Sequence, residues 1–134
     1  MKNKSILIAA ALVAVFLLGF IPQYVRANRL DSELRQSREA HAGAELRDLI
    51  GLAYLQANQK NYGLSAETSG RFFSHVPKIA NQTQDATRRK AVEDLLAPRD
   101  QITAALAKGD AAVVGDLQDL FIKTRAATEG AGAP

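Results

Sequence analysis

A long uncharged segment near the N-terminus is the feature that most constrains this 134-residue chain. The 21 residues between Lys4 and Arg26 carry no charge, and Ile6–Ile21 is apolar throughout. As a helix the uncharged segment would be ~31 Å long, which matches the ~30 Å hydrocarbon core of a bilayer. We therefore predict a transmembrane helix over residues 6–25, preceded by a basic tail over residues 1–5.

The residues that flank this segment are typical of a membrane boundary. Lys2 and Lys4 precede it, and Arg26 follows it. Tyr24 lies near its end, where an aromatic side chain favours the depth of the lipid headgroups. We expect these four residues to lie at the membrane interface, with the lipid bilayer as a partner of the chain.

Two interpretations of the segment keep the following domain outside the cytoplasm. As a signal anchor, the helix stays in the membrane. As a cleaved signal peptide, it is removed after Ala27, because Val25 and Ala27 occupy the −3 and −1 positions of a cleavage site and Pro22 supplies a helix break. The apolar run is longer than the about 7–15 residues usual in a signal peptide, which favours the anchor.

A third interpretation inverts the topology. Four arginines follow the segment closely: Arg26, Arg29, Arg35 and Arg38. By the positive-inside rule alone, they would place the C-terminal domain in the cytosol. A short basic tail before a long apolar run is nevertheless the pattern of an export signal. We therefore favour a bacterial-type inner-membrane protein, single-pass, whose C-terminal domain is periplasmic or otherwise extracytoplasmic.

The net charge of +3 does not indicate a nucleic-acid-binding protein. Lys2, Lys4 and Arg26 account for the whole excess, and the chain from Ala27 onward carries 14 basic and 14 acidic residues. Binding to phosphates requires clustered basic charge. We expect no nucleic-acid partner.

Residues 26–44 predict a helical stalk next to the membrane. Leu30 and Leu34 lie four residues apart and begin an apolar face. Ser37 and His41 occupy the next core positions of that face, so the stalk is a weak coiled-coil candidate. Self-association through it would be marginal.

Residues 45–128 predict a small helical domain. Apolar side chains surround most of the helix over residues 45–57, so we expect it to be the buried central helix. A second helix is expected over residues 62–82, with Asn61 as its cap and with a kink or an early end at Pro77.

A third helix begins near Thr83 or Asp85 and bends at Pro98, and Gly109 and Asp110 separate it from a fourth helix that contains Val113 and Phe121. No strand pattern is present. The predicted fold class is all-α, with an antiparallel four-helix bundle or stacked αα-hairpins. Residues 129–134, rich in Gly and Ala, predict a disordered tail.

The residues that carry most enzyme chemistry are sparse. The chain has no Cys, which excludes disulfides and thiolate chemistry. His41 and Glu45 lie four residues apart and provide half a metal site at most, and His75 is expected to be a helix-surface or boundary residue and not a catalytic base. We predict no catalytic residue, no metal ligand and no cofactor. An enzyme remains the third hypothesis, with a site around His75 or Glu93.

Aromatic residues are the candidates for an interaction surface. Phe72 and Phe73 are adjacent, so one helix cannot direct both rings to the same side. Burial of both between neighbouring helices is the favoured arrangement, and an exposed ring would mark a binding surface. Tyr54 and Tyr62 pose the same question.

The sequence therefore predicts a membrane-anchored interaction or scaffold protein that tethers or modulates a membrane-associated complex through a protein partner. The alternative is a secreted or periplasmic binding domain of ligand or chaperone type, released by cleavage after Ala27.

Overall fold

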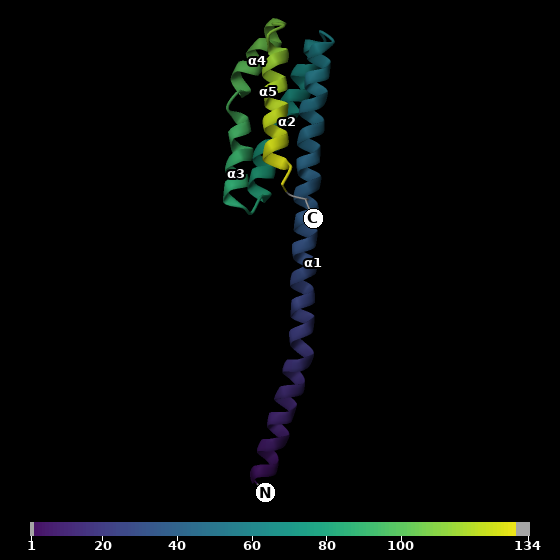
Figure 1. Ribbon diagram of the computed structural model, residues 1–134, viewed down its shortest axis with the longest axis vertical. Coiled ribbons are helices and arrows are strands. Elements are labelled where there is room, and N and C mark those ends of the chain that lie inside the picture. The colour runs from purple at the N-terminus through teal and green to yellow at the C-terminus, as the bar shows by residue number, and fades with distance from the viewer. Residues whose placement is uncertain (1, 131–134) are drawn as a thin grey trace. The chain divides into compact units, whose positions relative to one another are not determined.

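The computed structural model describes residues 2–130, except for the side chains of Lys2 and of residues 19–21. Every regular element in this range is helical, which confirms the all-α fold class (Figure 1). The elements are α1 (Lys2–Asn58), α2 (Tyr62–Gln82), α3 (Ala86–Glu93), the short 3-10 helix η1 (Asp94–Leu96), α4 (Arg99–Lys108) and α5 (Val113–Thr128).

The chain divides into two units, Met1–Arg35 and Gln36–Pro134. The first unit is the N-terminal part of α1. The second contains the rest of α1 and all other helices, so it begins before the predicted domain start at Glu45. The reason is packing: Gly43 is already buried, and Ala42 packs against the hydrophobic core.

Successive helical segments of the second unit alternate in direction (Figure 1). α2 returns along the end of α1, the segment formed by α3, η1 and α4 runs the opposite way, and α5 returns again. This is the antiparallel helical bundle that the sequence predicted, built from two helical hairpins.

Helix α1 continues through Pro22 and ends at Asn58. The continuous helix corrects the expectation that Pro22 supplies a helix break before a cleavage site. At the C-terminal end, Lys60 adopts a left-handed conformation with a φ of 62°. The Asn61 amide then donates to the Gln56 carbonyl at 2.9 Å, which satisfies a carbonyl of the last helical turn.

Helix α2 begins and ends where the sequence predicted. The Asn61 side chain accepts a hydrogen bond from the Leu64 amide at 3.4 Å and caps the first turn. Pro77 lies inside the helix, which continues to Gln82. The buried side chains beyond the proline, Ile79 and Ala80, pack into the core and hold this last part of the helix in place.

The predicted third helix is broken at Pro98 and not merely bent. Asp85 caps α3, because its carboxylate accepts a hydrogen bond from the Arg88 amide at 2.7 Å. The chain then tightens into η1, and α4 begins at Arg99. Proline lacks an amide proton and crowds the preceding turn, so the α-helical ladder stops before it.

Gly109 ends α4 in a left-handed conformation with a φ of 65°, which glycine adopts without steric cost. The Asp110 carboxylate accepts a hydrogen bond from the Ala112 amide at 2.9 Å and turns the chain toward α5. One helix therefore ends and the next is prepared at these two residues, as the sequence predicted.

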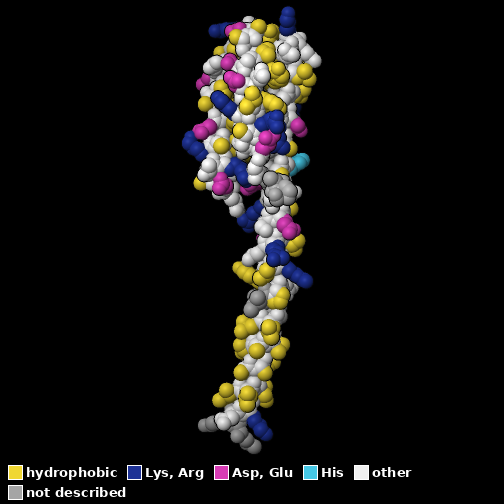
Figure 2. Space-filling model, viewed as in Figure 1, with side chains coloured by type: hydrophobic (Ala, Val, Ile, Leu, Met, Phe, Trp, Pro, Cys, Tyr) yellow, Lys and Arg dark blue, Asp and Glu magenta, His cyan; other side chains and the backbone are white. Residues whose placement is uncertain are grey.

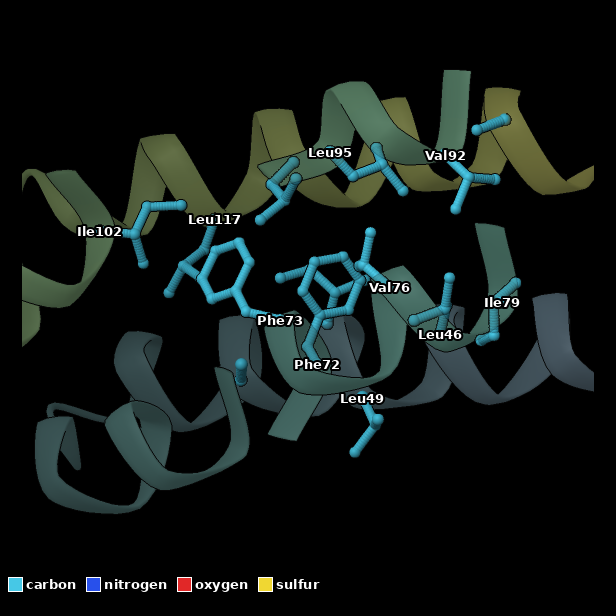
Figure 3. Close-up of a cluster of buried hydrophobic side chains, with 14 of the residues drawn as sticks. Leu46, Leu49, Phe72, Phe73, Val76, Ile79, Val92, Leu95, Ile102 and Leu117 are labelled. Atoms are coloured by element: carbon cyan, nitrogen blue, oxygen red, sulfur yellow. The ribbon is translucent and has the colours of Figure 1, made fainter. Parts of the chain in front are cut away.

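The hydrophobic core lies between α1, α2 and the layer formed by α3, η1, α4 and α5 (Figure 3). Side chains from each of these elements contribute to it, including Leu46, Phe72, Val92, Ile102 and Leu117. The Ser65 hydroxyl donates a buried hydrogen bond of 2.8 Å to the Ala53 carbonyl, which joins α2 to α1.

The first two residues of the predicted tail, Glu129 and Gly130, contact the bundle. Glu129 pairs with Arg125 at 2.6 Å, and the Gly130 carbonyl accepts a hydrogen bond from Arg88 at 3.0 Å. These contacts attach the start of the tail to the bundle. Residues 131–134 lie outside the described part of the chain.

Candidate interaction surfaces

The described side chains of the apolar segment of α1, from Ile6 to Leu18, are exposed. One stretch of this helix is long and apolar enough to cross a membrane, and none of that stretch is buried (Figure 2). Its large apolar side chains are Ile6, Leu7, Ile8, Leu12, Val13, Val15, Phe16, Leu17 and Leu18. A helix from the core of a soluble protein would be mostly buried, so this segment is not a core helix.

The predicted interface residues border this apolar segment. Lys4, Tyr24 and Arg26 are exposed, and the side chain of Lys2 lies outside the described structure. A shallow apolar groove runs along one face of the segment. It is lined by Ile6, Ala9, Ala10, Val13, Ala14 and Leu17.

The start of the stalk presents a second exposed apolar feature. Leu30 and Leu34 expose 66% and 49% of their surface. Both belong to the first unit, where the surrounding residues Arg29, Asp31 and Glu33 are polar and exposed. The two leucines therefore form a narrow apolar strip on a charged helix.

The structure does not support an interaction surface at Phe72 and Phe73. Their exposed fractions are 0% and 4%, and the rings meet edge to face with centroids 5.2 Å apart. In Figure 3 both rings point from α2 into the core, and Phe73 lies beside Leu117. Adjacent residues point about 100° apart on a helix, yet tertiary packing buries both of these rings.

Tyr54 and Tyr62 are half-buried and pack against the edge of the core. The Tyr62 ring lies beside Gly109, where an added Cβ would be 3.5 Å from the ring. This tyrosine therefore covers the turn between α4 and α5. The four predicted aromatic residues do not form one exposed surface, because two lie in the core and two at its edge.

Leu52 and Leu55 form the exposed apolar face that the sequence analysis missed. Both lie on α1 and expose about half of their surface. The expectation that residues 45–57 are buried on most sides is therefore wrong: the helix buries one face, including Leu46 and Ile50, and leaves the opposite face open. In the sequence, Leu52 and Leu55 lie three residues apart and outside the row of apolar residues that faces the core. This spacing is the signal that could have identified a second, exposed face.

A shallow groove with a volume of about 310 Å³ lies between the α3–η1 segment and α5. Apolar side chains form its floor, and Asp94 and Lys123 provide charge. Its lining is Ala91, Asp94, Leu95, Lys123, Ala126 and Ala127. Lys90 forms a hydrogen bond and an ion pair with Asp94, which raise the pKa of Lys90 above its ordinary value.

Polar contacts attach the first turns of α1 in the second unit to the rest of the bundle. Glu39 pairs with Arg88 at 3.4 Å, and its other carboxylate oxygen accepts from the Gln84 amide at 3.4 Å. Arg47 donates to the Thr128 hydroxyl at 2.7 Å. α1 is thus held both by α5 and by the turn before α3.

His75 forms polar contacts with α1 and with its own helix, α2. His75 Nε2 lies 3.3 Å from Glu45, and His75 Nδ1 lies 2.8 Å from the Arg71 carbonyl oxygen. His41 is exposed. Among the described residues, no group of three potential ligands is close enough to hold a metal ion.

Comparisons of this chain with protein-family models, with curated proteins and with solved structures find no match.

Proposed function

We propose that the chain is a single-pass membrane protein that holds a small helical interaction domain next to the bilayer. The observation that carries the proposal is the apolar segment of α1, whose described side chains, from Ile6 to Leu18, are exposed. Removing a large apolar side chain from water stabilises it by roughly 1.5–3 kcal/mol. For the nine large apolar side chains between Ile6 and Leu18, lipid would supply on the order of 15–25 kcal/mol.

The proposed role of the domain is contact with a protein partner in or near the membrane, with no catalysis of its own. Two surfaces support this role. The exposed pair Leu52 and Leu55 offers an apolar strip on α1, and the groove beside Leu95 offers a concave one. Exposed apolar strips and grooves of this kind suit an amphipathic helix of another protein.

The proposed location of the domain is outside the cytoplasm of a bacterial-type inner membrane. The basic tail with Lys2 and Lys4 then stays in the cytoplasm, and Tyr24 and Arg26 lie at the outer interface. The arginines that follow the segment oppose this orientation under the positive-inside rule, so the orientation needs its own test.

Alkaline carbonate extraction tests the anchor. The full chain is expected in the membrane pellet, and a Val13→Lys, Leu17→Lys variant is expected to shift toward the soluble fraction, because each lysine costs about 3 kcal/mol in the bilayer centre. The matched control places the same substitutions at Leu30 and Leu34 and should stay in the pellet. Extraction of the unmodified chain by carbonate would contradict the proposal.

Thiol labelling tests the orientation, because the chain has no native Cys. Asn3→Cys and Ser74→Cys each introduce one exposed thiol, at the tail and on α2. A membrane-impermeant maleimide applied to spheroplasts should label the thiol at position 74 and spare the thiol at position 3. Labelling of position 3 alone would establish the inverted topology.

The released domain remains the second candidate function, favoured by the spacing of Val25 and Ala27. It predicts a soluble mature protein that begins at Asn28. In that case the bundle and its surfaces would serve a ligand or a client protein away from the membrane.

A further inference from the structure

The exposed strip of Leu30 and Leu34 lies on a helix that carries a regular pattern of charges. When Ala27 and Leu34 are assigned to heptad position a, Leu30 occupies position d. Arg26 and Glu33 then occupy position g, and Asp31 occupies position e. These positions flank the apolar strip on both sides.

The flanking charges are complementary between two parallel copies. In a parallel coiled coil, the residue at g lies beside the residue at e five positions later in the partner helix. Arg26 would therefore pair with Asp31 of a second copy. By the same rule, Glu33 at position g would pair with Arg38 of the second copy, which lies five residues later at position e. Both pairs join opposite charges, as a self-complementary seam requires.

These charged side chains are available for such pairing. None of Arg26, Asp31, Glu33 and Arg38 takes part in an ion pair within residues 2–130. All four are exposed, as are the two leucines between them. The seam is therefore open in the single chain.

The same heptad phase continues into the apolar segment. Val13 and Ala27 are two heptads apart, and Ile6 and Ala9 occupy the a and d positions before Val13. Ile6, Ala9 and Val13 line the shallow groove on this part of α1. The groove and the leucine strip thus share one face of the heptad pattern within the first unit.

We infer that the stalk of this protein pairs with a second copy of the chain as a short parallel coiled coil, through Leu30, Leu34 and the Arg26–Asp31 and Glu33–Arg38 charge pairs. The inference rests on the proposed membrane anchor, because two copies anchored in one membrane are necessarily parallel. Confinement to the membrane also raises the effective concentration of the partner, which compensates for a short seam. Ser37 and His41 at the next d and a positions end it.

Disulfide trapping in membranes tests the seam in the full chain, which has no other thiol. Leu30→Cys and Leu34→Cys place thiols at d and a, and Ser32→Cys places one at the outer position f. A disulfide needs Cα atoms within about 7 Å, which a parallel pair provides at d and a but not at f. We expect at least fivefold more crosslinked dimer at positions 30 and 34 than at position 32. Equal crosslinking at the three positions, or none, would overturn the inference.

Charge reversal tests the register. In the Leu30→Cys background, Glu33→Arg brings two like-charged pairs together in each dimer and should lower the dimer association constant about tenfold. Adding Arg38→Glu restores opposite charges and should return crosslinking to within about twofold of the parent. A double variant that crosslinks no better than Glu33→Arg alone would exclude this register.

Failure of the seam and failure of the anchor give different results. A chain that resists carbonate extraction but does not crosslink at position 30 or 34 is an anchored monomer, which overturns only the dimer. If carbonate extracts the chain, the proposed anchor is wrong, and the dimer that rests on it is wrong as well.

Discussion

Gly43 of α1 lies directly against Thr128 of α5. A Cβ added at Gly43 would lie 3.0 Å from the Thr128 Cβ, closer than side chains normally approach. The same threonine accepts a hydrogen bond of 2.7 Å from Arg47. The close approach of two helix backbones at this point therefore depends on the absence of a side chain at position 43.

Gly43→Ala is expected to destabilise the bundle relative to the same change at Gly70. Alanine in a helix is favoured over glycine by about 1 kcal/mol, which Gly70→Ala should gain because nothing lies within 4 Å of its added Cβ. At Gly43 the contact with Thr128 should offset that gain, so the two variants should differ by about 1–2 kcal/mol. Urea unfolding of the detergent-solubilised chain measures the difference, and equal free energies of unfolding would refute the close packing.

The hydrogen bond between Ser65 and Ala53 gives a second prediction. Ser65→Ala removes the buried 2.8 Å bond and should lower the free energy of unfolding by about 1 kcal/mol. Ser74→Ala is the control on the same helix, because the exposed Ser74 hydroxyl bonds only to its own helix, at Arg71. It should change stability by less than about 0.5 kcal/mol. If both variants unfold at the same urea concentration as the parent, the bond does not hold α1 to α2.

The cap of α3 gives a third prediction. Asp85→Ala removes the acceptor for the Arg88 amide and should cost about 1 kcal/mol. Asp85→Ser keeps a capping oxygen and should recover most of that loss. Thermal unfolding followed by circular dichroism compares the two. An alanine variant as stable as the serine variant would show that the cap contributes nothing.

The two faces of α1 give a fourth prediction, about the stability of the bundle. Leu52→Glu and Leu55→Glu should change the free energy of unfolding by less than about 0.5 kcal/mol each, because both side chains are half exposed. Leu49→Ala, on the buried face of the same helix, should cost about 2–5 kcal/mol. Urea titration of the three variants checks the assignment of faces, and a large loss in either glutamate variant would mean that the bundle buries this face.

Local signals in the sequence predicted the helix boundaries that depend on a single turn. The cap at Asn61, the cap at Asp85 and the left-handed Gly109 act through neighbouring residues, so their positions are readable without tertiary structure. The outcome at the prolines is not local. Pro77 and Pro98 carry the same covalent restriction. Packing beyond Pro77 keeps α2 continuous, whereas the helix ends before Pro98 and a new helix, α4, begins after it.

The surfaces were harder to predict than the helices. Apolar residues around residues 45–57 indicate burial, yet only tertiary packing decides which of them face the core; Leu46 does and Leu52 does not. Likewise, adjacency predicted that Phe72 and Phe73 diverge, and only tertiary packing decides that both rings are buried. The sequence predicted the spacing of the two stalk leucines, whereas their exposure is a structural finding, because no second element lies among the described residues of the first unit.

The mature mass of the protein tests the proposed anchor most directly. Intact mass spectrometry of the chain purified from the membrane fraction should show a species that retains the tail with Lys2 and Lys4, because the apolar segment stays in the bilayer. A mature protein that begins at Asn28 and appears in the soluble fraction would contradict the anchor and establish the released domain.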